Sequence, residues 1–208
     1  NIAERGIWTA KKRYILNVWD SEGVRYEEPK LKMMGIEAVK SSTPAPCRTM
    51  IKDALKLMMR GTEDDVIEFI ENARKEFKSL PPEEIAFPRT ASNVQKYKSS
   101  SDIYVKGTPI HIRGALLFNY YLRKKKLTNK YSAIENGEKI KFLYLKKPNT
   151  IQENVLSFIQ DFPTEFGLSQ YIDYELQFEK SFVYPLKAIL DAIGWEVEKK
   201  VTLESFFS

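Results

Sequence analysis

The sequence predicts an α+β fold, with short antiparallel strands at the N-terminus followed by a mostly helical region that contains a small β element. Two patterns carry this prediction. Apolar residues alternate with polar ones in residues 13–34, and they recur at helical spacing in most segments that follow. The chain has 208 residues, of which 43% are hydrophobic. It therefore contains enough apolar material for a core, at a size that fits one or two domains.

Residues 13–34 are predicted to form the strands. The stretch RYILNVWD (13–20) alternates between two faces, SEG (21–23) supplies turn residues, and KLKMMG (30–35) resumes the strand. A turn with glycine at its end, placed between two alternating stretches, is typical of a β-hairpin.

Two helices are predicted after Gly35. For the first, Ser42 and Thr43 are N-cap candidates, Pro44 occupies the first helical position and Gly61 ends the helix. The second begins at Thr62, three residues before Asp65, which is the spacing of a capping box. The carboxylates at positions 63–65 lie in its first turn, where they favour the helix dipole, so capping is a stronger interpretation than metal binding.

The remaining elements are less regular. After the break at Pro81 and Pro82, residues 85–110 are predicted to be irregular, residues 111–126 to form a helix with a basic end, and residues 137–147 to form a strand. From Ile151 onward the pattern favours helix, and its longest stretch, residues 173–195, is expected to bend near Pro185.

Several classes of function are excluded or disfavoured. No apolar run approaches the roughly 20 residues of a membrane span, and Glu4 and Arg5 lie where a signal peptide would need apolar residues. A single cysteine, Cys47, and a single histidine, His111, argue against a disulfide framework and a structural zinc site, and fit a reducing cytosol. The sequence has no phosphate-binding loop and no G-x-S-x-G motif. Cys47 falls on the apolar face of its helix, so a Cys47–His111 catalytic pair is disfavoured as well.

Charge is distributed unevenly. The net charge is +5, but residues 89–147 hold 14 Lys and Arg against 3 Asp and Glu. Residues 61–84 and 148–208 are acidic, with net charges of −5 and −6. Such segregation predicts a positive face that attracts phosphates, although basic loops that only increase solubility remain the alternative.

The cations gather in short clusters beside aromatic or polar residues. These are Lys11, Lys12 and Arg13 before Tyr14; Lys96 and Lys98 around Tyr97; His111 and Arg113; Arg123 to Lys126; and Lys146 and Lys147. Several spaced cations are what phosphate neutralisation requires, and ammonium or guanidinium groups can also reach the similar minor-groove acceptors of all base pairs. Composition therefore predicts non-sequence-specific binding to nucleic acid.

The final eight residues, VTLESFFS (201–208), carry three large apolar side chains, Leu203, Phe206 and Phe207. Either these side chains fold back onto the core, or they form an exposed peptide that docks into a pocket of a partner. Spacing alone leaves both interpretations open.

Four motifs in order resemble the C-terminal quarter of family B replicative DNA polymerases, closest to those of T-even-type bacteriophages and their marine relatives. They are KKRY (11–14) before a strand, EPKLKMMGIEAVKSSTP (28–44) leading into a helix, NVQKY (93–97) and PIHIRG (109–114). The resemblance covers essentially the whole chain. It implies that residues 1–35 are the C-terminal end of the polymerase palm, residues 36–198 the thumb, and residues 199–208 a tail that binds a sliding clamp.

The resemblance also implies roles for single residues. Lys11 and Lys12 are expected to contact the newest base pairs and the primer backbone, with Arg13 and Tyr14 holding that strand. On the thumb, the positions expected to face the primer strand are Lys96, His111, Arg113 and Lys180, with Lys106 as an approximate match. Tyr184 lies where close relatives carry a further lysine, and Arg123 to Lys126 are assigned to DNA on charge alone. In the tail, Leu203, Phe206 and Phe207 are the expected clamp contacts.

In that family the catalytic aspartates, the fingers and the exonuclease domain precede the lysine motif, and none is found in these residues. The resemblance therefore implies that Mg²⁺ is held by residues outside this chain, and that the chain alone is inactive. Its expected partners are primer–template DNA, a sliding clamp and an N-terminal polymerase portion or subunit, in the cytoplasm of an infected bacterium. Two alternatives remain: a freestanding nucleic-acid-binding accessory protein, and a clamp-docking module.

Overall fold

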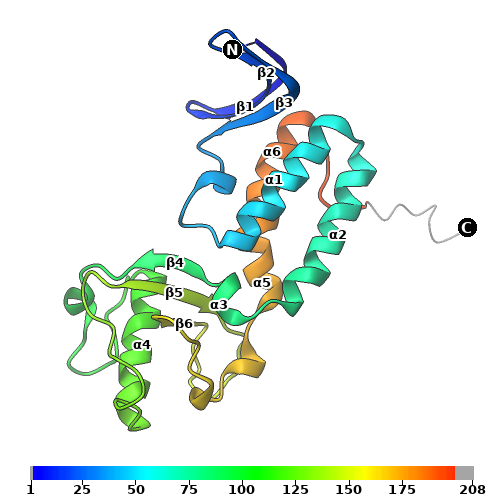
Figure 1. Cartoon of the computed structure of the whole chain (residues 1–208). Coiled ribbons are helices and arrows are strands. Elements are labelled where there is room, and N and C mark those ends of the chain that lie inside the picture. Colours follow the sequence, from blue (N-terminus) through cyan, green and yellow to red (C-terminus); the bar gives the residue numbers. More distant parts are fainter. Residues whose placement is uncertain (1, 200–208) are drawn as a thin grey trace, which may run out of the picture. The chain divides into compact units, whose positions relative to one another are not determined.

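The computed structural model describes residues 2–199, which form two compact units (Figure 1). Unit 1 contains residues 2–40, 46–79 and 178–199, and unit 2 contains residues 41–45 and 80–177. Each unit has a three-stranded antiparallel sheet and at least one long helix. The α+β prediction is therefore confirmed. The division into 1–35, 36–198 and 199–208 rests on the resemblance and stays a prediction.

The sheet of unit 1 has the strand order β1–β2–β3, with β1 (Ile2–Ala10), β2 (Arg13–Ser21) and β3 (Val24–Met34). Strands β2 and β3 confirm the strands predicted within residues 13–34 and the turn at Gly23, and they pair as an antiparallel hairpin. Strand β1 was not predicted. It lies at the edge of the sheet and is mostly exposed. Its sequence therefore lacks the regular alternation of apolar and polar residues that indicates a half-buried strand.

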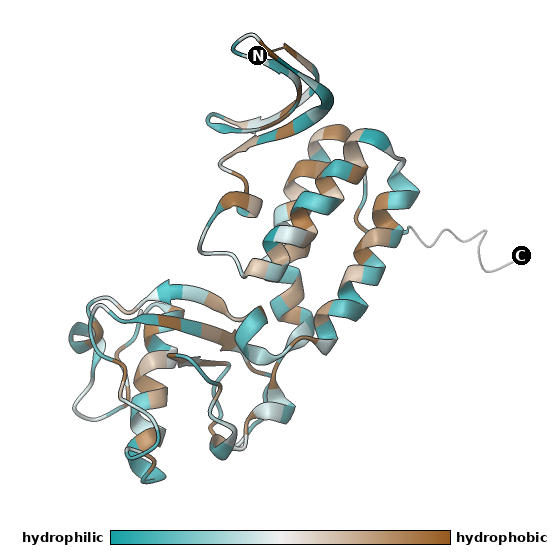
Figure 2. Ribbon diagram, in the orientation of Figure 1, coloured by the Kyte–Doolittle hydropathy of each residue, from teal (hydrophilic) through white to brown (hydrophobic). Residues whose placement is uncertain are grey.

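Two long helices follow in unit 1, α1 (Ala45–Arg60) and α2 (Glu63–Ser79). Helix α1 begins one residue later than predicted, after Pro44, and ends before Gly61 as predicted. The capping box of α2 is confirmed, because Asp65 accepts the backbone N–H of Thr62 at 2.7 Å and donates its own N–H to the Thr62 hydroxyl at 3.3 Å. These hydrogen bonds lower the pKa of Asp65. Figure 2 shows hydrophobic and hydrophilic residues alternating along both helices, and their apolar faces are buried.

The long C-terminal helical stretch is interrupted before Pro185. Helix α5 (Tyr174–Phe178) passes into five residues of π-helix (Glu179–Val183), and helix α6 (Tyr184–Leu190) follows. Proline has no N–H to donate to the preceding turn, so a wider turn at this point accommodates it. The irregularity therefore occurs where the sequence predicts a bend.

Aromatic rings from segments far apart in the sequence pack together in the core of unit 1. The ring centroid of Phe178 lies 5.2 Å from that of Phe77 and 4.9 Å from that of Phe182. Cys47 is fully buried nearby and its Sγ lies 3.2 Å from the hydroxyl of Ser181. Burial raises the pKa of the Cys47 thiol to about 11. A protonated, inaccessible thiol is a poor nucleophile, which agrees with the disfavoured cysteine–histidine pair.

Unit 2 has the strand order β4–β5–β6, with β4 (Phe87–Thr90), β5 (Lys139–Tyr144) and β6 (Val155–Phe158). The short helix α3 (Pro82–Ile85) precedes the sheet, and α4 (Ile110–Lys124) lies against it (Figure 1). Helix α4 and strand β5 confirm the predictions for residues 111–126 and 137–147.

Two predictions for unit 2 were wrong. Residues 85–110 are not irregular throughout, since β4 lies within them, and the residues from Ile151 do not continue as helix, because they contain β6. Pro88 hides β4 in the sequence, because a proline argues against a strand. All four residues of β6 are buried, and a short continuous apolar run does not distinguish strand from helix.

A close contact fixes α4 on β6. A Cβ added at Gly114 would lie 2.7 Å from the backbone nitrogen of Ser157 and would also overlap the Ser157 hydroxyl. That hydroxyl donates to the carbonyl of His111 at 2.8 Å. The first turn of α4, which carries His111 and Arg113, is therefore held at a defined position on the sheet.

Replacing Gly114 by alanine is expected to destabilise the protein by about 1–3 kcal/mol, because the backbone of β6 has to move away from the new methyl group. Urea denaturation measures the change in the free energy of unfolding. Ala188→Ser, which adds one atom at an exposed position of α6, is the matched control and should change stability by less than about 0.5 kcal/mol. Equal stability of Gly114→Ala and the parent chain would contradict the close contact.

Candidate nucleic-acid interface

Lys11 and Lys12 form the turn between β1 and β2. Ala10 pairs with Arg13 across the hairpin, so the two lysines are the two loop residues. Both are exposed, and Lys12 has a left-handed backbone conformation with φ of 62°. No ion pair or hydrogen bond of either ammonium group is found among residues 2–199. The turn therefore presents two adjacent positive charges to solvent.

Arg13, the residue after this turn, is fixed by hydrogen bonds to Gly35 and Glu37. Its guanidinium donates to both carboxylate oxygens of Glu37, at 2.9 and 2.6 Å, and to the carbonyl of Gly35 at 2.9 Å. Burial alone would raise the pKa of Glu37, but hydrogen bonds from Arg13 and Lys40 outweigh it and lower the pKa. Gly35 has φ of 68°, and a Cβ there would overlap the carbonyl of Lys12. The backbone of the turn is thus held by Arg13 and Gly35, while its lysine side chains remain free.

One face of the same sheet exposes apolar side chains. In the register of the strands, Trp8 pairs with Tyr14, and Tyr14 pairs with Met34. Trp8 is 65% exposed and Met34 47% exposed, whereas Tyr14 is half-buried. The Trp8 ring lies over Gly6, because a Cβ at Gly6 would lie 2.6 Å from it. The lysine turn therefore stands at the end of an exposed aromatic and apolar row.

In unit 2, Arg113 is held by side chains from the loop that contains Tyr104 and from Asn154, the residue before β6. Its Nη2 donates to the amide oxygen of Asn154 at 2.6 Å, and its guanidinium lies 5.7 Å from the ring of Tyr104. The Tyr104 hydroxyl in turn donates to Glu153. Nε of Arg113 is buried and has no hydrogen-bond partner among residues 2–199. The guanidinium is thus oriented by Asn154 and Tyr104.

A second arginine, Arg89, lies beside His111. Its guanidinium stacks at 5.6 Å on the rings of both Phe87 and Phe142, and it donates to the carbonyl of Ser42 at 2.7 Å. The positive charge of Arg89 lowers the pKa of His111. Burial raises the pKa of Tyr144, and the charges of Arg89 and Arg113 oppose this rise. We call this group the basic–aromatic cluster; its members are Arg89, Tyr104, His111, Arg113, Phe142 and Tyr144.

His111 is expected to titrate below its ordinary value of about 6.5. Burial makes the larger contribution to lowering its pKa, and the positive charge of Arg89 lowers the pKa further. The folded chain then binds fewer protons than the unfolded chain just below that pH, so stability is lost as the pH falls through this range. Because His111 is the single histidine, NMR can follow its ring signals directly.

The control for this titration is Arg89→Gln, which removes the charge and should raise the midpoint of His111 towards its ordinary value. A midpoint of His111 at or above about 6.5 in the parent chain would contradict the described surroundings.

The other predicted DNA contacts are exposed and are divided between the two units. Lys96 in unit 2 lies 5.6 Å from the ring of Tyr97, and Lys106 is on the loop that follows Tyr104. Lys180 belongs to unit 1, on the π-helical segment, where it lies 5.9 Å from the ring of Tyr184. Leu203, Phe206 and Phe207 lie outside the described residues.

Sequence reasoning missed Arg89, Tyr104 and Glu37. For Arg89 a signal existed. Phe87 and Arg89 alternate, and their strand pairs Phe87 with Phe142 and Arg89 with Ile140, which puts them on the face that carries Tyr144. Nothing in the sequence indicates that Tyr104 would meet Arg113, because that contact depends on the path of a loop.

No group of three or more His, Cys, Asp and Glu side chains within residues 2–199 could hold a metal ion. No helix in the same range has both the length and the apolar character needed to cross a membrane.

Comparison with known proteins gives two relatives over nearly the full chain, while no family model matches. The DNA-directed DNA polymerase of Enterobacteria phage T4 is 32% identical over 206 residues, and that of Escherichia phage RB69 is 36% identical over 207 residues. Each alignment covers 97% of this chain and 22% of the relative, so the chain spans about a fifth of the length of the polymerases it matches. Over almost its whole length, the chain is therefore homologous to a C-terminal piece of the DNA-directed DNA polymerases of T-even phages.

Proposed function

We propose that this chain acts as the C-terminal part of a DNA-directed DNA polymerase and grips the primer–template duplex behind an active site built by other residues. The observation that carries the proposal is the lysine turn. Lys11 and Lys12 are free and exposed, whereas Arg13, next in sequence, is held by Glu37. Two exposed lysines side by side favour a negatively charged ligand, and similarity to two phage DNA polymerases supports DNA as that ligand.

The lysine turn suits a duplex of any sequence. Every base pair displays acceptors at similar positions of the minor groove, so an ammonium group there contacts a correct pair without reading its sequence. Arg13 positions the turn through Glu37, and its own contact with the primer strand, like that of Tyr14, stays part of the proposal.

The basic–aromatic cluster suits phosphates. The side chain of Arg113 is fixed by Asn154 and Tyr104, so little side-chain entropy is lost when it binds an anion. An oriented guanidinium can also bind phosphate in a bidentate manner. His111, Lys96 and Lys106 in unit 2, and Lys180 in unit 1, are proposed to add further backbone contacts.

Catalysis is proposed to take place outside this chain. Phosphoryl transfer by polymerases needs carboxylates that hold Mg²⁺, which stabilises the attacking and leaving oxygens. We expect those ligands to belong to an N-terminal polymerase portion, so that this chain alone binds DNA but does not extend it.

The sheet of unit 1 supports such a partner. Ile2, Trp8, Val24 and Met34 are all at least 47% exposed, and β1 is an edge strand of its sheet. Exposed apolar faces and open edges favour association with another chain or segment.

The clamp contact and the location complete the proposal. Leu203, Phe206 and Phe207 are proposed to bind a sliding clamp, and the enzyme is proposed to work in the cytoplasm of an infected bacterium, since both relatives are phage polymerases.

Duplex binding by this chain tests the proposal. Fluorescence anisotropy with a labelled primer–template at several salt concentrations should give tight binding whose logarithm falls linearly with the logarithm of salt. Replacing Arg113 by alanine should reduce the slope by about 0.9 for each phosphate that this side chain neutralises. Lys75→Ala, which removes one exposed charge of α2, is the control and should leave the slope unchanged. Absence of duplex binding by the folded chain would refute the proposed grip.

A further inference from the structure

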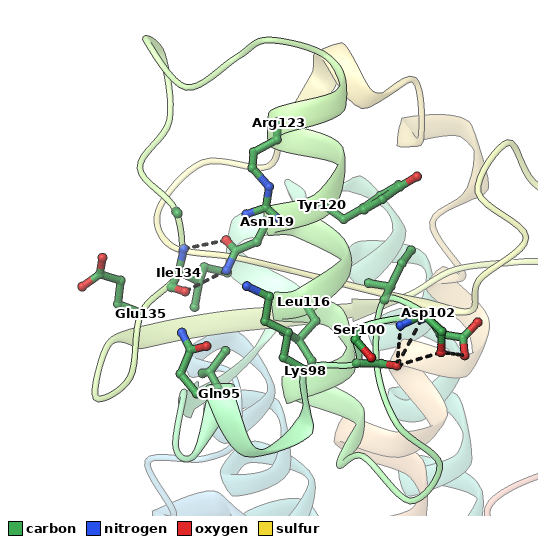
Figure 3. A pocket seen from close by; sticks show the side chains of 15 residues that line it. Gln95, Lys98, Ser100, Asp102, Leu116, Asn119, Tyr120, Arg123, Ile134 and Glu135 are labelled. Carbon is green, nitrogen blue, oxygen red and sulfur yellow. Dashed lines mark hydrogen bonds between the residues drawn. The ribbon is translucent and has the colours of Figure 1, made fainter.

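A pocket of about 550 Å³ lies in unit 2, on the side of α4 formed by Leu116, Asn119, Tyr120 and Arg123 (Figure 3). Its other walls are the loop of residues 98–103 and the segment Ala133–Glu135. No residue with a role implied by the resemblance lines this pocket. Arg123 does line it, but its assignment to DNA rests on charge alone.

The walls of this pocket are fixed by hydrogen bonds. The Asn119 amide donates to the carbonyl of Ile134 at 2.8 Å and accepts the N–H of Ile134 at 2.7 Å. In the loop, the hydroxyl of Ser99 accepts the N–H groups of Ser101 and Asp102 at 3.3 and 3.1 Å. The pocket is thus largely formed before any ligand binds, as small-ligand sites usually are.

Two cations at its rim are available to a ligand. Lys98 and Arg123 are both exposed and have no ion pair or hydrogen bond among residues 2–199. Figure 3 shows their side chains extending towards each other from opposite sides, whereas the Glu135 carboxylate points away. Asp102, the other acid of the lining, accepts a hydrogen bond from Ser101. This arrangement favours an anionic group between Lys98 and Arg123.

Apolar and aromatic groups complete the pocket. Val94, Leu116 and Ile134 are almost fully buried at its base, and Tyr120 is 37% exposed with its ring in an edge contact with Tyr121. Gln95 and the serine hydroxyls add neutral hydrogen-bonding groups. The site therefore combines two exposed cations with a partly exposed aromatic ring, the two kinds of group that bind phosphates and stack on bases.

We propose that this pocket binds an unpaired nucleotide of single-stranded DNA, with its phosphates at Lys98 and Arg123 and its base against Tyr120. A duplex presents convex rows of phosphate and keeps its bases stacked inside, so it does not fill a pocket of this kind. An unpaired base can turn outward and enter it. The inference goes beyond the proposed duplex grip and gives the cation at position 123 a specific role.

The test is anisotropy with a labelled oligothymidylate of about eight nucleotides, using the whole chain. The double variant Lys98→Ala/Arg123→Ala should lower the salt slope of single-strand binding by about 0.7 for each phosphate that these two side chains neutralise. The variant Tyr120→Ala should weaken binding by about fivefold or more, whereas Tyr120→Phe, which keeps the ring, should bind like the parent. Lys52→Ala/Lys75→Ala removes the same charge from exposed residues outside the pocket and is the matched control.

Two further probes separate the outcomes. A blunt duplex measures the proposed grip and should bind the Tyr120 variants as it binds the parent chain. An abasic single strand of equal charge should bind less tightly than oligothymidylate. Equal binding of the abasic strand, or equal weakening in the control and pocket variants, would show a general basic surface and overturn the nucleotide site, without affecting the result for the duplex.

Discussion

Primer extension is expected to slow by about tenfold for each of Lys11 and Lys12 replaced by alanine, in a polymerase that carries this chain as its C-terminal part. Each ammonium group is proposed to donate charged hydrogen bonds to the newest base pairs, and removal of such a bond costs about 1.5–3 kcal/mol. The effect should be larger after a mismatch, because a mispaired terminus already lacks part of the regular minor-groove pattern. Single-turnover extension from matched and mismatched primers measures both effects.

The matched control removes two exposed lysines from helices of the same unit, Lys52 in α1 and Lys75 in α2. That variant should extend at the parent rate. Because Arg13 and Glu37 hold the turn, Lys11→Ala and Lys12→Ala should fold normally, which circular dichroism can verify. Unchanged extension by the Lys11/Lys12 double variant would remove the role proposed for the turn.

Deleting residues 201–208 is expected to abolish stimulation by the sliding clamp while leaving synthesis on short templates intact. A tether raises the effective concentration of the polymerase at the primer end, and such linkage can change apparent affinity by about 10²- to 10⁴-fold without a new contact at the active site. Product length on a long primed template, with and without clamp, measures the effect.

A triple replacement of Leu203, Phe206 and Phe207 by alanine should reproduce the deletion, because apolar side chains that fill a pocket provide most of the binding energy of such a peptide. Thr202→Ala/Ser205→Ala keeps those side chains and should respond to the clamp as the parent does. A full clamp response from the deleted protein would exclude the tail as the docking peptide.

Local signals in the sequence predicted the elements that local chemistry determines. Thr62 and Asp65 define the start of α2 through a capping box, Gly23 marks the hairpin between β2 and β3, and Pro185 marks the change in helical pattern. Each depends on neighbours within a few residues, so a single sequence contains the whole signal.

The missed elements depend on distant partners. Strand β1 is recognisable only beside β2, and β4 forms in spite of Pro88 because Phe87 and Arg89 pair with β5. The same is true of the candidate site. The sequence identified Lys11, His111 and Arg113 as candidate DNA contacts, but their surroundings arise from contacts over long separations. Arg13, for example, is 24 residues from Glu37.

The most direct test of the central claim is primer extension by a chimaeric polymerase, in which this chain replaces the matching C-terminal segment of the Escherichia phage RB69 enzyme. With Mg²⁺ and all four nucleotides, the chimaera should extend a primer, whereas this chain alone should bind the same primer–template without extending it. Extension by this chain alone would contradict the account. So would a folded chimaera that binds primer–template as tightly as the RB69 enzyme and still makes no product.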